Sequence, residues 1–173
     1  MKTKLPLFAL MMLSASLIFT ACKKDNNSKT ATLNVRLTDA PADYSAVNVD
    51  VKEVRIKFKD DATEDDWQTL PTKVGIYNLL AFQNGVDTLL ATGIVATNPV
   101  KQIRLVLGTN NSIVVSGVVY PLTIPSGEES GLKIMINKNI AQPVENIIID
   151  FNALLSIKEE NGNYKLRPVL QVK

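Results

Sequence analysis

The sequence predicts an all-β protein, an antiparallel β-sandwich or barrel with a single short helical turn near residues 77–82. Two observations indicate this fold. From Ala31 onward apolar residues recur mostly at every second position, which is the pattern of half-buried strands. Clusters of Gly, Pro, Asn and Asp divide the chain into short segments, as is usual in antiparallel sandwiches and barrels.

The first two strands are expected at residues 33–37 and 46–59. The second changes parity, because its inward apolar residues are first odd and then even: Val47, Val49 and Val51, then Val54, Ile56 and Phe58. A strand that keeps one face inward needs an extra residue to do this, so we expect a β-bulge or sharp bend at Lys52–Glu53. Such a bend could carry the strand from one sheet to the other. Two separate strands with a tight break are the alternative.

Later segments with the composition or alternation of strands are 67–70, 88–91, 102–107, 113–115, 118–120, 132–136, 144–151 and 166–172. Ser116–Gly117 separates two of them and predicts a hairpin turn. Pro121 and Pro168 indicate a sheet edge or a strand end. Residues 147–149 are apolar on both faces, which favours an interior position in a sheet.

The N-terminal segment has the features of a secretion signal. A basic start, Met1–Lys4, precedes the apolar run Leu5–Phe19, and two small residues precede Cys22, the only cysteine. The run is about 15 residues long, which is too short to cross a hydrocarbon core of about 30 Å comfortably. Cleavage before an acylated Cys22 is therefore expected rather than a permanent anchor helix. An ordinary signal peptide with a chance cysteine is the alternative.

The segment Phe19-Thr20-Ala21-Cys22 resembles the relaxed lipobox of Bacteroidetes lipoproteins, although Phe19 stands where leucine is usual. The resemblance implies a multiply acylated Cys22 that holds the protein in the outer membrane of a Gram-negative bacterium. Residues 23–27 (KKDNN) are similar to the tags that direct such lipoproteins to the cell surface. The predicted organisation is a signal peptide at 1–21, the lipidated cysteine and a flexible tether at 22–30, and a single domain at 31–173.

Composition excludes several classes of function. Loss of Lys2 and Lys4 with the signal leaves as many basic as acidic residues, and they are scattered, so nucleic acid is not an expected partner. The chain has no histidine, which removes the commonest acid–base catalyst and metal ligand, and no serine has a histidine base. We expect no cofactor and no enzymatic activity. A carboxylate pair acting on glycosides is the remaining catalytic hypothesis.

Two groups of acidic residues are candidate ligand or metal sites. The first is a loop with the sequence Asp60, Asp61, Glu64, Asp65 and Asp66, whose oxygens suit calcium. It lacks the glycine-bearing spacing of an EF-hand, so a solvated loop is the favoured interpretation. The second is the pair Asp39 and Asp43 on either side of Pro41, for which capping of the local turn is favoured.

Aromatic side chains are candidates for stacking on carbohydrate. Trp67 and Tyr120 are the first candidates, and Tyr44, Tyr77 and Tyr164 are the others. For Trp67 we favour packing at the rim of the core. The polar segment 124–131 is a candidate binding loop or a simple connection.

Several segments in order resemble a bacterial family of exported domains of unknown function, numbered 4382. They are 35–41 (VRLTDAP), 47–54, 67–70, 77–80, 83–86, 102–107, 125–127 and 130–133 (SGLK). The resemblance implies a sandwich related to transthyretin-like and immunoglobulin-like domains, with no established activity. Because two of these segments recur in the family, it also marks places to look for a site: Asp39, Pro41, Ser130, Gly131 and Lys133.

These observations favour a lipid-anchored, non-enzymatic binding or scaffold module of the cell envelope, whose partner is a glycan or an envelope protein. The first alternative is a structural subunit of a surface assembly such as a pilus, built by strand addition. The second is a carboxylate-dependent hydrolase.

Overall fold

The computed structural model describes residues 30–125 and 131–173. In this part of the chain nearly all regular structure is β. The strands are β1 (Thr30–Asp39), β2 (Ala46–Lys57), β3 (Gln68–Leu70), β4 (Gly75–Asn78), β5 (Thr88–Ala96), β6 (Val100–Leu107), β7 (Ser112–Val115), β8 (Val118–Thr123), β9 (Leu132–Lys138), β10 (Val144–Phe151), β11 (Ile157–Glu160), β12 (Asn163–Leu166) and β13 (Leu170–Val172). The helical elements are the 3₁₀ turn η1 (Leu79–Phe82) and the short helix α1 (Ala153–Ser156).

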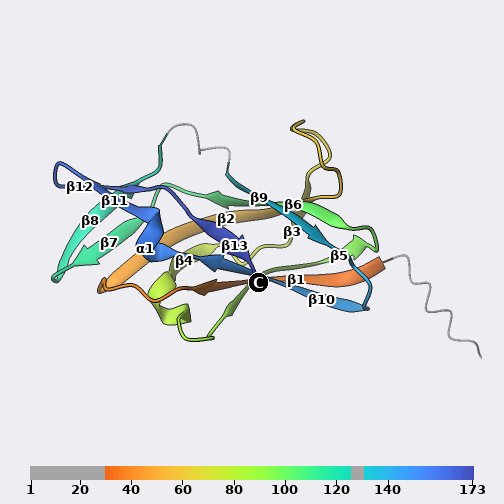
Figure 1. Cartoon of the computed structure of the whole chain (residues 1–173), viewed down its shortest axis with the longest axis horizontal. Coiled ribbons are helices and arrows are strands. Elements are labelled where there is room, and N and C mark those ends of the chain that lie inside the picture. Colours follow the sequence, from red (N-terminus) through yellow and green to blue (C-terminus); the bar gives the residue numbers. More distant parts are fainter. Residues whose placement is uncertain (1–29, 126–130) are drawn as a thin grey trace, which may run out of the picture.

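The strands form two sheets that pack face to face (Figure 1). The smaller sheet has the order β13-β10-β1-β5. The larger sheet has the order β11-β12-β8-β7-β2-β6-β9, and β3 and β4 also pair with β2. The prediction of an all-β sandwich is therefore confirmed.

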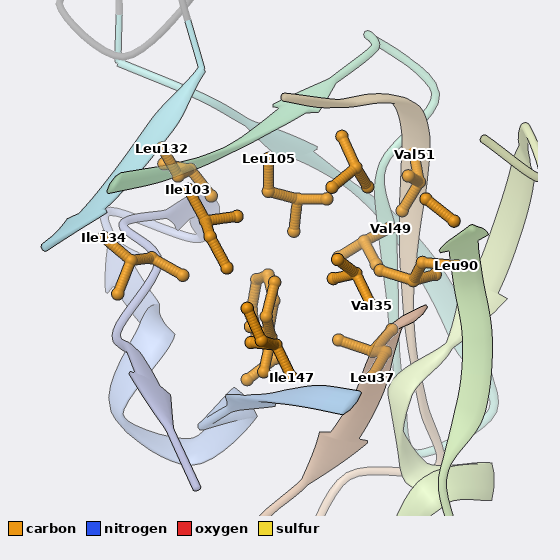
Figure 2. Close-up of a cluster of buried hydrophobic side chains, with 14 of the residues drawn as sticks. Val35, Leu37, Val49, Val51, Leu90, Ile103, Leu105, Leu132, Ile134 and Ile147 are labelled. Atoms are coloured by element: carbon orange, nitrogen blue, oxygen red, sulfur yellow. The ribbon is translucent and has the colours of Figure 1, made fainter. Parts of the chain in front are cut away.

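The core lies between the two sheets (Figure 2). Val35, Leu37 and Ile147 of the smaller sheet face Val49, Ile103 and Leu105 of the larger sheet, and all six are fully buried. These side chains occupy alternate positions on their strands, as the period of two requires. Burial of this continuous apolar layer is the main stabilising contribution in a domain that has no disulfide.

The sheets are mixed, which differs from the purely antiparallel arrangement expected from the sequence. β1 pairs with β10 in parallel from Thr32↔Val144 to Asp39↔Phe151, and β12 pairs with β8 in parallel. Alternation of apolar residues specifies which face of a strand is buried but carries no information on strand direction. β1 and β10 are far apart in the sequence, so the connection is long enough for a parallel pair.

The predicted bulge in β2 is confirmed. The register with β6 shifts between Val51 and Glu53, so Lys52 is the extra residue. β2 is one continuous strand and stays in the larger sheet, so the suggested crossing between sheets was wrong. On one edge of β2, the strand β4 pairs with the residues before the bulge and the strand β3 pairs with the residues after it.

Other local predictions are confirmed with small differences. The β7–β8 hairpin turns at Ser116 and Gly117, whose φ angles of 50° and 81° fit the type I′ turn that right-handed twist favours. η1 is the predicted helical turn, and the side chain of Asn78 accepts a hydrogen bond from the Leu80 amide. β10 is an interior strand and β13 an edge strand, as expected. Pro121, however, lies inside β8, and β12 pairs with β8 only from Leu122 onward.

The predicted signal peptide, Cys22 and Ser130 lie outside the described residues. Within residues 30–125 and 131–173, no helix has both the length and the hydropathy needed to cross a membrane.

Candidate functional site

Two tyrosines on neighbouring strands make an aromatic contact at one end of the larger sheet. Tyr120 is on β8 and Tyr164 is on β12, at the end of the molecule where Figure 1 shows β7, β8, β11 and β12, on the left. Their ring centroids are 5.0 Å apart and the ring planes are tilted by 55°. This is the separation and tilt of a favourable aromatic pair.

The strand period explains why both rings lie on the inner side of this sheet. Tyr120 is two residues before Leu122, and Tyr164 is two residues before Leu166. Both leucines are buried, so each tyrosine shares the core-facing side of its strand and lies at the margin of the core. Val118, on the same side of β8, is 51 % exposed, which shows that the core ends here.

Tyr44 completes what we call the tyrosine cluster (Tyr44, Tyr120 and Tyr164). It lies in the connection between β1 and β2 and is partly buried against the core. Burial raises the pKa of Tyr164, and the nearby Glu159, Tyr120 and Tyr44 raise it further. The fold thus brings the rings of Tyr120 and Tyr164 into contact, with Tyr44 near enough for its charge to act on Tyr164.

The hydroxyl groups of the tyrosine cluster are available to a ligand. None of them has a hydrogen-bond partner in residues 30–125 and 131–173, and none is a buried unsatisfied group. Tyr77 differs, because its ring packs on Phe82 and its hydroxyl donates to the Lys73 carbonyl at 2.6 Å. The cluster therefore offers partly exposed ring surface and three hydroxyls without a partner in the described part of the chain, and these are the groups that recognise a sugar through stacking and hydrogen bonds.

The acidic loop, residues 60–66, folds over the outer face of the larger sheet. Asp61 pairs with the fully buried ammonium of Lys57, Asp66 pairs with Lys59, and Glu64 pairs with both Arg104 and Lys133. Asp60 and Asp65 are exposed. In the described part of the chain, no three acidic, histidine or cysteine side chains are grouped so that they could hold a metal ion. Three of the five loop carboxylates are thus used as partners for cations.

Trp67 lies beside this loop and away from the tyrosine cluster. The Arg104 guanidinium carbon is 4.3 Å from the centroid of its ring, and the Lys57 ammonium is 5.9 Å from it. The Trp67 ring is half-buried, and its indole nitrogen is buried without a hydrogen-bond partner among the residues that the structure describes. It packs against cations of the outer face, so a sugar could stack on Trp67 only where Arg104 leaves the ring uncovered.

Asp39 and Asp43 have different environments. Asp39 is buried and accepts a hydrogen bond from the Ala153 amide at 2.9 Å and another from Gln83 at 3.4 Å. Asp43 is exposed on the β1–β2 connection. Asp39 therefore caps a distant helix, and the amide of Ala40 in its own turn also bonds to its carboxylate. Burial raises its pKa, although the amide of Ala153 opposes this effect.

Of the residues marked by the SGLK segment, Gly131 and Lys133 are described, and they lie next to the acidic loop and Arg104. Lys133 is on β9 and pairs with Glu64. Gly131 has a φ of 102°, and a Cβ atom there would lie 2.9 Å from Cγ of Arg104. Only glycine fits this position, because both the backbone angle and the contact exclude a side chain.

Sequence reasoning missed Lys57 and Arg104 as buried charges. Both occupy strand positions that face away from the core, and such positions are usually solvated. The available signal was the acidic loop that follows Lys57 directly, because an excess of carboxylates beside a strand with cations can fold back and pair with them.

Comparison with known families supports the resemblance found in the sequence. The model of the family described as Domain of unknown function (DUF4382) matches residues 30–168. The chain belongs to this family. The matched region runs from the start of β1 to just before β13, so the DUF4382 domain corresponds to the sandwich. No curated protein and no solved structure matches this DUF4382 chain.

Proposed function

We propose that this protein is a lipid-anchored, non-enzymatic module of the bacterial cell envelope that binds envelope glycan through the tyrosine cluster. The observation that carries the proposal is the Tyr120–Tyr164 contact with Tyr44 nearby at one end of the sandwich, with partly exposed rings and with hydroxyls that have no partner among the described residues. Sugars present CH groups to ring faces and hydroxyls to hydrogen-bonding groups, and tyrosine meets both needs.

Anchoring and export are supported by the N-terminal sequence. The basic start, the short apolar run and Cys22 after two small residues make up the pattern of an acylated signal. A domain held to the membrane by lipid can contact polymer at the cell surface without a catalytic function. The absence of histidine throughout the sequence supports a binding role over hydrolysis that depends on a histidine base.

Binding of surface polysaccharide is tested by glycan array and by titration calorimetry on the full chain. Tyr164→Phe and Tyr120→Phe keep the rings and remove one hydroxyl each. Each is expected to weaken binding about two- to tenfold, the value of one hydrogen bond. Tyr77→Phe is the matched control, because its hydroxyl bonds to Lys73 and lies outside the cluster. Equal binding by all four proteins, or no binding by any, would contradict the proposal.

Lipid anchoring is tested separately in cells. Incorporation of labelled palmitate is expected in the natural chain and is expected to be lost in Cys22→Ser. Protease treatment of intact cells then reports whether the domain faces outward. Incorporation that persists in Cys22→Ser would disprove the anchor without affecting the glycan hypothesis.

A structural subunit that assembles by strand addition is the second candidate. It is favoured by β9 and β13, which are edge strands of different sheets and have no further strand beside them in residues 30–125 and 131–173. The groove between them has a volume of about 460 Å³ and is lined by residues 134–138 and 170–172. Strand addition needs such an edge with adjoining apolar pockets. Sedimentation at rising protein concentration tests it, and a chain that stays monomeric would contradict it.

A further inference from the structure

Three cations occupy adjacent positions on the outer face of the larger sheet. Arg55 of β2 is in register with Arg104 of β6, and Arg104 is in register with Lys133 of β9. We call this set the cationic row (Arg55, Arg104 and Lys133). Like charges on directly opposed strand positions repel each other, so the row needs anions close by to be stable.

Two carboxylates supply this negative charge, and they do so differently. Glu53 pairs with Arg55 from the same strand, two residues away. Glu64 comes from the acidic loop and bridges the other two cations, with its Oε2 2.6 Å from Nη2 of Arg104 and its Oε1 bonded to Lys133. These two bonds lower the pKa of Glu64 to about 2, so its carboxylate is charged at any physiological pH.

The hydrogen-bonding capacity of Arg104 is only partly used by Glu64. The Arg104 side chain is only 3 % exposed, and its Nε is buried without a hydrogen-bond partner in the described part of the chain. Nε and Nη2 together form the edge of a guanidinium that binds a carboxylate through two parallel hydrogen bonds. Glu64 uses Nη2 only, because its other oxygen bonds to Lys133. The ring of Trp67 lies under Arg104, and its indole nitrogen is a second buried donor that has no partner within residues 30–125 and 131–173.

Glu64 is also the exposed member of the contact. Its side chain is 60 % exposed. Arg104, in contrast, is held by the sheet and by the Trp67 ring, and it packs so closely on Gly131 that a Cβ atom there would collide with it. The cations are thus preorganised, and the anion is attached through an exposed loop position. A carboxylate from solution that satisfies Nε and Nη2 of Arg104 together can compete with Glu64.

We propose that Arg104 and Lys133 form a binding site for the carboxylate of a ligand, and that Glu64 is an internal occupant which the ligand displaces. The ligand chemistry is a planar carboxylate, carried either by a uronic acid sugar or by a peptide C-terminus. The site lies on the outer face over β6 and β9, whereas the tyrosine cluster lies on β8, β12 and the β1–β2 connection, so the proposal is independent of the glycan function.

Trp67 is the only tryptophan of the chain, so its fluorescence reports directly on this site. The full chain is titrated with tri-galacturonic acid and, separately, with the peptide acetyl-Gly-Gly-Ala bearing a free carboxylate. Tri-galacturonic acid methyl ester and the amidated peptide are the neutral counterparts. Saturable quenching by one of the two acids and not by its neutral counterpart is expected, and the active acid identifies the source of the carboxylate.

Variants separate displacement from simple charge attraction. Glu64→Gln removes the occupant's charge and is expected to tighten binding about fivefold or more, because no internal carboxylate then competes. Glu159→Gln removes the same charge from an exposed position on β11 and is expected to leave the affinity unchanged. Lys133→Gln, in the Glu64→Gln background, is expected to weaken binding about tenfold.

Arg104→Lys keeps the charge, removes the planar fork and should abolish the response. Because Arg104 is buried and this variant could unfold, the exposed Lys133→Gln change carries the same test on a surface residue. The proposal is overturned if neither acid changes the fluorescence of Glu64→Gln, if the ester or amide binds as well as the acid, or if Glu64→Gln and Glu159→Gln tighten binding equally.

Discussion

The carboxylate of Asp39 accepts a hydrogen bond from the backbone amide of Ala153, 114 residues later in the chain. Asp39 is the last residue of β1, and Ala153 is the first residue of α1. A helix begins with amides that have no partner inside the helix, and a buried oxygen satisfies one of them here. β10 neighbours β1, and this contact fixes the path of the chain where it leaves β10. It gives a structural reason for aspartate in the LTDAP segment.

Replacement of Asp39 should therefore destabilise the fold. Asp39→Ala removes the acceptor and leaves the Ala153 amide buried without a partner, so the free energy of unfolding should fall by about 1–3 kcal/mol. Urea denaturation followed by circular dichroism measures this. Asp43→Ala, at an exposed position of the same connection, should change it by less than about 0.5 kcal/mol. A comparable loss in both variants would show that the Ala153 contact is not the cause.

Glu64 should give stability that is lost in acid. Its pKa is lowered to about 2 by Lys133 and Arg104, so the folded protein keeps this carboxylate charged where the unfolded chain takes up a proton. The contribution is present above the unfolded value near 4.5 and disappears as the pH falls toward 2. As the pH is lowered from 6 to 2, the urea midpoint of unfolding should fall less steeply in Glu64→Gln than in the natural protein. Parallel curves for the two proteins would contradict the assignment.

Asp39 should show the opposite dependence on pH. Burial raises its pKa, so the folded protein holds the proton in a range where the unfolded chain has lost it. Its contribution is greatest below the unfolded value of 3.8 and is lost as the pH rises through the raised value. Asp39→Asn cannot titrate at this position. As the pH rises from 3 to 6, the free energy of unfolding of the natural protein should therefore fall relative to that of Asp39→Asn. A difference that stays constant over this range would count against a raised pKa.

The sequence was sufficient for the positions of most strands, because those strands bury one face. Val144–Phe151 was expected from its apolar pattern and is β10 without change. The parity change around Lys52 located the bulge, since an extra residue is the only way to keep both halves of β2 turned inward. Strand direction was not predictable in this way, and the parallel β1–β10 pair was missed for that reason.

The sites were less predictable than the fold, because they depend on contacts between distant segments. Tyr120 and Tyr164 were both candidates, but only the β8–β12 pairing places their rings together. Burial of Arg104 depends on where the acidic loop folds, which no local pattern encodes. α1 was missed because it is only four residues long, although Asn152 in front of it is a residue that commonly caps helices.

Gly108 should not tolerate a side chain. A Cβ atom there would lie 2.2 Å from Oδ2 of Asp50, whose carboxylate is buried and accepts the Asn110 amide. Gly108→Ala is therefore expected to lower the free energy of unfolding by about 1–3 kcal/mol through overpacking. Gly75→Ala is the matched control, because the nearest atom would be 3.9 Å away, at ordinary contact distance. Thermal unfolding followed by circular dichroism would compare them, and equal midpoints would rule out the steric conflict.

Lys57 and Asp61 should be strongly coupled. The ammonium of Lys57 is fully buried, bonds to Asp61, and donates to the backbone carbonyl of Thr63 at 2.8 Å. Removal of Asp61 leaves a buried positive charge without its counterion, whereas Lys57→Met removes the charge and keeps most of the side-chain volume. Asp61→Ala should therefore lower the unfolding midpoint more than Lys57→Met does.

The double variant decides between an ion pair and two independent contacts. If the loss in Asp61→Ala comes from the uncompensated charge, then adding Lys57→Met to it should restore part of the midpoint, so the two effects should not add. Asp60→Ala, an exposed neighbour in the same loop, should behave the same with or without Lys57→Met. If the changes in unfolding midpoint caused by Lys57→Met and Asp61→Ala add strictly, then the acidic loop is not held on the sheet by this charge pair.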